Sequence, residues 1–232
     1  FRPQRQGPSG KRAAKLAHRA MQSASEIVPF PGGRERAPAQ LARRVLTVDI
    51  GGSNVKILVS GQTEPRRRRS GRMLTPAKLV QIVHALAGDW EYDAVSIGYP
   101  GLVGKDGPSS EPGNLGPGWV GFDFHAALDR PTRMINDAAM QALGNYESGS
   151  MLYLGLGTGL GSALIAHGDV IALELGCLQY DRNQTLGDVL GNQGLERLGK
   201  RAWRHIVSET AAAMMKAFAV HTVVLGGGNA KR

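Results

Sequence analysis

Two short runs of alternating apolar and polar residues stand near residue 50, and a glycine turn joins them. The runs cover residues 46–50 and 55–59 and are rich in β-branched side chains, so they predict two strands. Gly51 and Gly52 in the turn carry no Cβ, which lets backbone N–H groups approach a phosphate closely. Taken alone, this stretch fits an ordinary hairpin equally well.

The elements that follow alternate between helix and strand. A helix is expected after Thr75, which can cap it. Pro76 would occupy its first helical position, and Gly88 would end it. A strand is expected over 94–98. Residues 101–124 are rich in glycine and proline and predict a long ordered loop, of a kind that often binds ligands. This alternation indicates an α/β lobe.

The second half of the chain repeats the plan of strand, glycine turn and strand. The repeat occupies residues 151–166, with its glycines between Gly155 and Gly161. The other elements expected in the second half of the chain are a strand ending at Ile135, a helix over 138–143, helical patterns over 186–198 and 203–219 that Gly199 separates, and a strand over 221–225 before Gly226–Gly228. Three glycine turns at strand ends offer three places where backbone can approach a chain of phosphates.

Positive charge is concentrated outside this pattern. Residues 1–44 have a net charge of +8, whereas the remaining residues are nearly neutral at +1. The many prolines there predict a flexible extension, with one short helix over 11–24, and an organellar transit peptide is a second interpretation. Four consecutive arginines, Arg66–Arg69, predict a solvated loop, with a polyanion contact as the alternative. No specific nucleic-acid partner is expected.

Several classes of protein are excluded or disfavoured. Cys177 is the only cysteine, so no internal disulfide and no thiolate zinc cluster can form, which fits a reducing cytoplasm. The longest uncharged run, 149–166, is too short and too rich in glycine for a membrane span. The P-loop spacing is absent, and no Gly-x-Gly-x-x-Gly run opens a helix, so those two nucleotide-binding architectures are disfavoured.

Six motifs, in this order, together resemble the ROK family of bacterial sugar kinases and repressors, and most of all its polyphosphate or ATP glucokinase branch. They are residues 49–56 (DIGGSNVK), 98–101 (GYPG), 114–119 (NLGPGW), 135–138 (INDA), 155–161 (GLGTGLG) and 225–229 (LGGGN). The resemblance implies an α/β, two-lobed actin/hexokinase-type (ribonuclease H-like) fold with a cleft between its lobes. The expected domains are the extension 1–44, an N-terminal lobe 45–136 and a C-terminal lobe 137–232.

The resemblance also implies roles for residues, with Asp137 as the general base. The sugar would be bound by Asn114, Asn136, Glu174 and Cys177. The phosphoryl donor would be bound by Asp49, Gly51, Gly52, Ser53, Asn54, Lys56, Gly157, Thr158, Gly159, Gly161, Gly226, Gly227 and Gly228. A carboxylate within hydrogen-bond reach of the attacking sugar hydroxyl can accept its proton as the phosphoryl group arrives. Without the flanking motifs, Asn136–Asp137 would be interpreted as a helix cap.

The expected cofactor is Mg²⁺, near Asp49, with ATP or inorganic polyphosphate as the donor and no structural zinc. Cys177 stands where the family commonly has a histidine, so sugar binding is expected to be weaker or altered. The alternative is that Cys177 is a small buried side chain. Only three residues follow the third glycine turn, so the C-terminal lobe is expected to be truncated at its end.

These observations lead to one main hypothesis. The protein is a cytoplasmic, homodimeric sugar kinase that moves a phosphoryl group from ATP or polyphosphate to a hexose, with the 6-hydroxyl of glucose as the expected acceptor. The alternative is a non-catalytic sugar-sensing regulator or a degenerate homologue.

Overall fold

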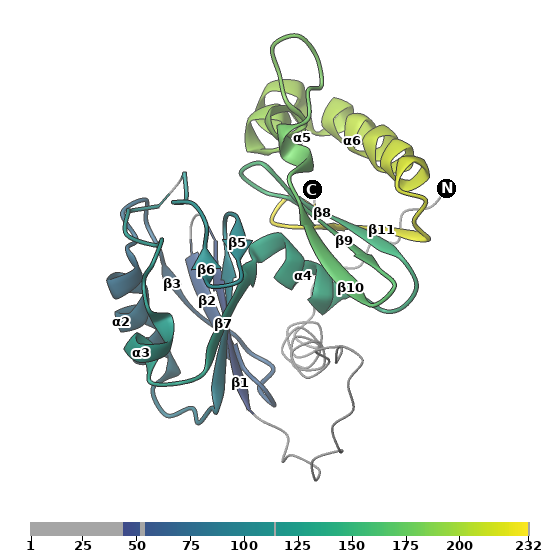
Figure 1. Ribbon diagram of the computed structural model, residues 1–232. Helices are drawn as coiled ribbons and strands as arrows, with labels where there is room; N and C mark the ends of the chain where they lie inside the picture. Colours follow the sequence, from purple (N-terminus) through teal and green to yellow (C-terminus); the bar gives the residue numbers. More distant parts are fainter. Residues whose placement is uncertain (1–43, 52–53, 114, 232) are drawn as a thin grey trace. The chain divides into compact units, whose positions relative to one another are not determined.

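The computed structural model describes residues 44–51, 54–113 and 115–231. These residues separate into two compact units, one ending at Asp137 and the other beginning at Ala138. Each unit has its own sheet and its own hydrophobic core (Figure 1). The expectations for residues 1–44 fall almost entirely outside the described residues, as do those for Gly52, Ser53 and Asn114.

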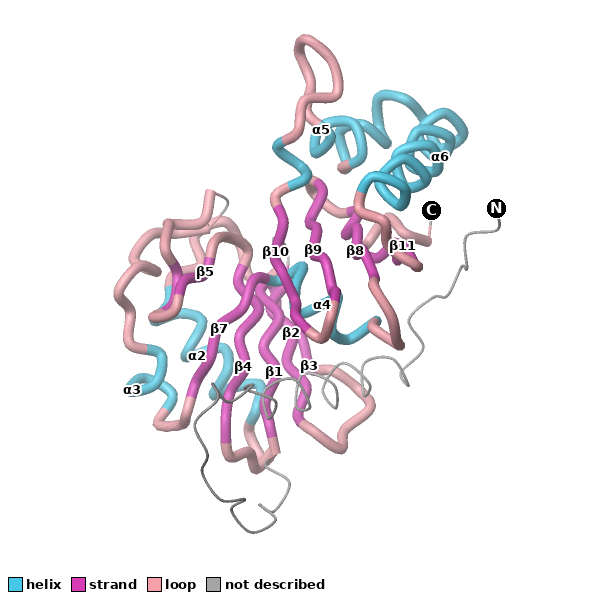
Figure 2. The backbone as a smooth tube through the Cα atoms, turned by 45° about the vertical axis from the view of Figure 1, so that its right-hand side comes forward, coloured by secondary structure: helices cyan, strands magenta, loops and turns pink. Residues whose placement is uncertain are grey.

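The first unit is built on a five-stranded sheet, which Figure 2 shows as adjacent magenta strands. Its order is β3 (Arg66–Arg69), β2 (Asn54–Val59), β1 (Val45–Ile50), β4 (Ala94–Tyr99) and β7 (Thr132–Asn136). Strands β1, β4 and β7 run parallel, whereas β2 and β3 are antiparallel to their neighbours. The predicted hairpin near residue 50 is thus present as β1 and β2.

Two helices cover one face of this sheet, α2 (Pro76–Ala87) and α3 (Phe124–Leu128) (Figure 1). Helix α2 begins as expected, because the Thr75 side chain accepts a hydrogen bond from the Lys78 N–H (3.4 Å). It ends at Gly88, whose φ of 51° suits glycine. Alternate residues of β1, β2 and β4 point towards these helices and form the core.

The second unit is built on a four-stranded sheet in the order β10 (Asp169–Leu173), β9 (Leu160–Ala166), β8 (Met151–Leu156) and β11 (Thr222–Gly226). Strands β8 and β11 are parallel and the other pairs antiparallel. The helices of this unit are α4 (Asp137–Asn145, whose first residue belongs to the other unit), the short 3-10 helix η1 (Leu175–Cys177), α5 (Leu186–Leu190) and α6 (Asn192–Ala217).

The second sheet is covered on both faces. Leu152, Leu154 and Leu156 of β8 share a core with Trp203 and other buried residues of α6. On the opposite face, the Tyr153 hydroxyl donates to Gln141 Oε1 of α4 (2.6 Å). Strand β8 is therefore buried on both sides, which explains why it reads as a nearly continuous apolar run.

Three local predictions are wrong or incomplete. Arg66–Arg69 form the edge strand β3 and not a loop, because all four pair with residues 54–57 of β2. The helix expected over 186–198 is broken at Gly191, which has an extended backbone. The break at Gly199 is confirmed by its φ of 72° and ψ of 160°. Helix α3, strand β10 and the small hairpin of β5 (Val103–Gly104) and β6 (Gly107–Pro108) were not expected.

Among the described residues, no helix combines the length and the apolar character that crossing a bilayer requires.

Candidate functional site

Polar candidate residues of the first unit gather at one edge of its sheet. Strands β1, β4 and β7 are parallel, so their carboxyl ends meet there. Asp49 pairs with Gly98, which in turn pairs with Ile135 in the next strand. Two interstrand spacings therefore separate Asp49 from the end of β7, about 10 Å. The Asp49 turn and Asn136–Asp137 thus lie along the same sheet edge.

Asp49 is not an isolated carboxylate. The register of the hairpin places Lys56 directly opposite it, and Lys56 Nζ lies 3.4 Å from Asp49 Oδ2. The Asp49 side chain is 23% exposed and that of Lys56 is 50% exposed. The pair brings one positive and one negative group to the start of the glycine turn.

The described ends of the turn are held by hydrogen bonds. The Gly51 N–H donates to the Asn54 carbonyl (3.0 Å), which closes the hairpin. The Ser70 hydroxyl, just beyond β3, donates to the Gly51 carbonyl (3.1 Å). A Cβ added to Gly51 would lie 3.2 Å from the Asn54 carbonyl oxygen, so a larger residue would crowd this closure. Gly52 and Ser53 lie outside the described residues.

Asn136 ends β7, and Asp137 opens α4. Asn136 is buried, and its Nδ2 donates to the Gly101 carbonyl (3.2 Å), which fixes the turn after β4. Asp137 is half-buried in the first turn of a helix, where the helix dipole favours a negative charge. The position therefore suits an ionised carboxylate that can accept a proton.

The loop between β6 and α3, which carries Asn114, is anchored by Glu111. Its carboxylate accepts the N–H groups of Trp119 (3.0 Å to Oε1) and Val120 (3.1 Å). These backbone donors hold the pKa of Glu111 below its ordinary value, and the N–H of Trp119 has the largest effect. Trp119 itself is fully buried, with its ring 5.4 Å from the Tyr99 ring, centroid to centroid. Burial raises the pKa of Tyr99 to about 12, so its hydroxyl stays protonated.

The second unit brings two glycine turns together. Gly155 pairs with Gly226 in the parallel strands β8 and β11, so the turns that follow these strands are neighbours. Asn229 joins them: its N–H donates to the Leu156 carbonyl (3.0 Å), and its side-chain Nδ2 lies 3.4 Å from the Gly157 carbonyl. The same Nδ2 donates to Asn192 Oδ1 (2.7 Å), at the start of α6.

Glycine occurs in these two turns for two different reasons. At Gly227 the φ is +80°, and a Cβ would lie 2.4 Å from the Leu156 carbonyl oxygen, so only glycine fits. At Gly226 a Cβ would meet the Tyr153 hydroxyl. At Gly157, Gly159 and Gly228, by contrast, a Cβ would meet nothing within 4 Å, and their φ values are not positive. These three glycines leave open space over the backbone, as an approaching ligand requires.

Glu174 and Cys177 lie at the two ends of η1. The Cys177 N–H donates to the Glu174 carbonyl (3.0 Å), and both residues are exposed. The alternative that Cys177 is a small buried side chain is therefore wrong. Both side chains are therefore accessible to a solute.

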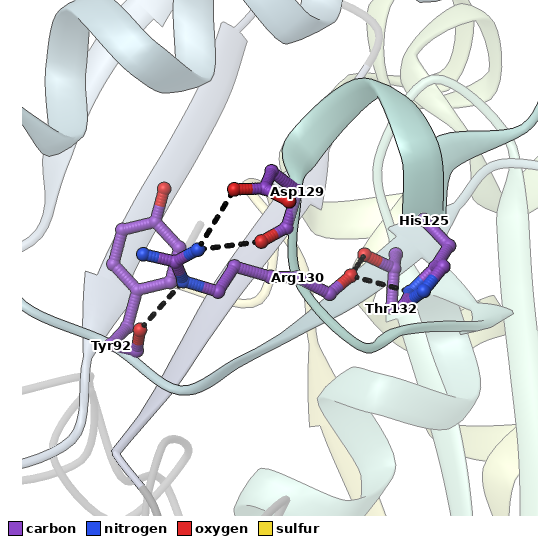
Figure 3. Close-up of polar contacts among 5 residues, drawn as sticks. All are labelled: Tyr92, His125, Asp129, Arg130 and Thr132. Carbon is purple, nitrogen blue, oxygen red and sulfur yellow. Dashed lines mark hydrogen bonds and ion pairs between the residues drawn. The ribbon is translucent and has the colours of Figure 1, made fainter.

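A cavity of about 390 Å³ in the first unit lies away from these residues. It is lined by Arg44, His84, Ala87, Gly88, Trp90, Glu91, Tyr92 and Arg130, which cluster near the amino ends of β1, β4 and β7. The guanidinium of Arg130 in this lining is already hydrogen-bonded, because it donates to the Asp129 carbonyl (2.6 Å) and to the Tyr92 carbonyl (3.3 Å) (Figure 3). The Arg130 carbonyl in turn accepts from Thr132 Oγ1 and lies 2.9 Å from His125 Nδ1. This end of the sheet is held by internal hydrogen bonds.

The described part of the chain contains no group of three or more His, Cys, Asp or Glu side chains that could hold a metal ion. Within the first unit, the candidates Asp49, Gly51, Asn54, Lys56 and Asn136–Asp137 share one sheet edge. Within the second, Gly157–Gly161 and Gly226–Gly228 are brought together. Sequence reasoning missed that Asn229 and Asn192 link the two turns of the second unit; the only signal was Asn229 directly after three glycines.

With this geometry, the chain can be placed among known proteins. The model of the ROK family matches residues 45–187, and the chain belongs to this family. Its relatives are sugar kinases, and its fold is the α/β fold of ROK sugar kinases, of the actin/hexokinase type.

Three similar proteins illustrate this. The bifunctional enzyme NanE/NanK of Brucella melitensis is 32% identical over 173 residues, which cover 66% of this chain and 32% of that protein. Polyphosphate glucokinase of Mycobacterium leprae is 24% identical over 206 residues, which cover 80% of this chain and 63% of that protein. The crystal structure of inorganic polyphosphate/ATP-glucomannokinase from Arthrobacter sp. strain KM matches with a TM-score of 0.69 and 24% identity, over 82% of this chain and 85% of that one. The chain thus spans less than two thirds of the length of either curated relative.

Proposed function

We propose that this protein is a kinase that transfers a phosphoryl group from ATP or inorganic polyphosphate to the 6-hydroxyl of a hexose, with glucose as the first candidate. One observation carries the proposal. The carboxyl edge of the first sheet holds both the turn bounded by Gly51 and Asn54 and the carboxylate of Asp137. A phosphate-facing turn and a proton acceptor along one edge are what phosphoryl transfer to an alcohol requires.

Asp137 acts as the general base in this proposal. As the sugar oxygen forms its bond to phosphorus, the bond between phosphorus and the leaving oxygen of the donor breaks. The hydroxyl proton passes to the Asp137 carboxylate and then to solvent. The products are the sugar phosphate and either ADP or a polyphosphate shortened by one unit.

The residues at the turn fit a magnesium ion that arrives with the donor. Mg²⁺ keeps most of its ligands as water and substrate phosphate oxygens, and it needs only one or two protein carboxylates. Asp49 supplies one partly exposed carboxylate, and Lys56 beside it adds a positive charge for the phosphates. Bound there, the ion would neutralise charge on the transferred group.

The remaining assignments concern the sugar and the rest of the donor. Gly157, Thr158, Gly159 and Gly161 take the inner phosphates, and Gly226–Gly228 pack against adenosine when ATP is the donor. The open space over Gly157, Gly159 and Gly228 supports this assignment. Asn136, Glu174 and Cys177, with Asn114, bind sugar hydroxyls. Two of the similar proteins, a polyphosphate glucokinase and a polyphosphate/ATP-glucomannokinase, support a glucose-like acceptor and both donors.

A non-catalytic sugar-binding protein is the second candidate, and Cys177 favours it. A thiol is a weaker hydrogen-bonding group than imidazole, and Cys177 is exposed at the end of η1 where the resemblance places a sugar contact. Glucose binding without turnover would support this candidate.

The test combines calorimetry with glucose and a coupled assay with each donor. Asp137→Asn keeps the shape of the side chain but removes its basicity, so kcat is expected to fall by at least about 100-fold. Asp129→Asn is the matched control, because Asp129 is fully exposed and sits in a left-handed position that asparagine tolerates. If Asp137→Asn retains most of its turnover, the base assignment is wrong.

A further inference from the structure

The four consecutive arginines of β3 are not equivalent, because a strand sends alternate side chains to opposite faces. Arg66 and Arg68 pair with Ile57 and Val55, whose side chains are buried on the helix-covered face. Arg67 pairs with Lys56 and Arg69 with Asn54. Arg67 and Arg69 therefore lie on the other face, with Lys56.

Arg66 has a structural role. Its guanidinium donates to the Leu86 and Ala87 carbonyls (2.8 and 3.0 Å) and so satisfies the last turn of α2. It also pairs with Asp89 (2.8 Å) and lies 4.0 Å from the centroid of the Trp90 ring. Packing of the first unit accounts for this arginine and leaves the next three unexplained.

Lys56, Arg67 and Arg69 form a cationic stripe beside the candidate phosphate turn. All three are exposed, and neither Arg67 nor Arg69 makes an ion pair with a described residue. The carboxylate next to this stripe is that of Asp49, and Lys56 already pairs with it (3.4 Å). Arg69 stands opposite Asn54, and the next residue, Ser70, donates to the Gly51 carbonyl (3.1 Å). The stripe therefore begins at the turn itself.

We infer that this stripe holds the outer phosphates of a linear inorganic polyphosphate chain whose terminal phosphoryl group lies beside Gly51 and Asn54. The inference rests on the proposed function and names its donor. Arg67 and Arg69 are two residues apart, about 6.8 Å along the strand, so their charges follow an extended anion. Strands β1, β2 and β3 contain no aromatic residue, whereas surfaces that bind single-stranded nucleic acid use aromatic rings to stack the bases.

The test uses the full chain with both arginines of the stripe replaced, Arg67→Gln with Arg69→Gln. Its matched control is Arg68→Gln, which removes the same charge from the opposite face of the same strand. The ratio of kcat/KM with long-chain polyphosphate to kcat/KM with ATP is expected to fall about tenfold in the double variant, as two exposed charge contacts allow. In Arg68→Gln the ratio should change less than about twofold.

A binding measurement that does not depend on turnover accompanies the assay. Fluorescently labelled polyphosphate should bind the wild type with an affinity that weakens as salt is added, and the dependence should be shallower in the double variant. An equal loss in Arg68→Gln would overturn the inference, as would a wild type that uses ATP but neither uses nor binds polyphosphate. Displacement of the label by single-stranded DNA at equal phosphate concentration would also overturn it, because the surface would then be a general polyanion site. If no donor supports turnover in the wild type, it is the proposed function that fails, and the labelled-polyphosphate measurement still decides the stripe.

Discussion

Each unit fixes a glycine-rich segment at its candidate site, but the two use different chemical groups. In the first unit the exposed carboxylate of Glu111 accepts the N–H groups of Trp119 and Val120. In the second, the buried amide of Asn229 joins two turns and contacts Asn192. The first anchor carries a charge and the second does not. The two segments should therefore respond differently to pH, although both hold backbone in place.

The largest expected effect comes from the backbone of the second unit. Gly227→Ala places a Cβ against the Leu156 carbonyl at a φ of +80°, and the free energy of unfolding should fall by about 3 kcal/mol. Urea unfolding measures the change. Gly228→Ala is the matched control, with no neighbour within 4 Å of the new Cβ, and should stay within about 0.5 kcal/mol of the wild type. Equal losses in the two variants would show that close backbone approach does not explain Gly227.

A smaller effect is expected from removing the amide anchor. Asn229→Ala deletes the contacts with Asn192 Oδ1 and the Gly157 carbonyl and should lower the free energy of unfolding by about 1.5 kcal/mol. Because no charge is lost, the decrease should be the same at about pH 5 and about pH 8. Asn183→Ala, in an exposed loop, serves as the control. A decrease that varies with pH would contradict the distinction between the two anchors.

The smallest effect belongs to the charged anchor, and it should depend on pH. The Trp119 and Val120 N–H groups lower the pKa of Glu111 from its ordinary 4.5, so its carboxylate stabilises the fold above that value. This stabilisation is lost as the pH falls through the lower, folded-state pKa. The difference in Tm between the wild type and Glu111→Gln should therefore shrink as the pH is lowered from about 6 to about 3.

Two other carboxylates with lowered pKa values also make the stability depend on pH in this range. Arg66 lowers the pKa of Asp89, and Thr185 that of Asp188, so the wild-type curve alone does not isolate Glu111. Subtracting the curve of Glu111→Gln removes their contribution. Glu64→Gln, an exposed carboxylate before β3, is the control and should give a difference that does not change with pH. A constant difference for Glu111→Gln would contradict its role as a charged anchor.

Local patterns predicted much of the fold. The hairpin near residue 50, the two ends of α2 and the break at Gly199 followed from side-chain alternation, capping and glycine. The edge strand of four arginines could not be predicted in this way. It forms because the neighbouring strand β2 offers a free edge and because α2 offers carbonyl groups to Arg66, and a run of four charged side chains reveals neither contact.

The candidate site was predicted less completely than the fold. Asp49, the glycine turns and Asn136–Asp137 stand at strand ends, where motifs mark them. That Lys56 lies opposite Asp49 depends on the register of the hairpin, and the link between Asn229 and Asn192 depends on the parallel pairing of β8 with β11. The exposure of Cys177 depends on η1, which a lone cysteine in the sequence does not reveal.

The position of Trp119 gives the first unit an optical reporter. Its indole is fully buried, donates to the Gly116 carbonyl (2.7 Å) and packs at a tilt between the rings of Tyr99 and Phe124. Any rearrangement of this loop must change the surroundings of that ring. Fluorescence from a chain in which Trp90 and Trp203 are replaced by phenylalanine would follow the loop during a titration with sugar, without any added label.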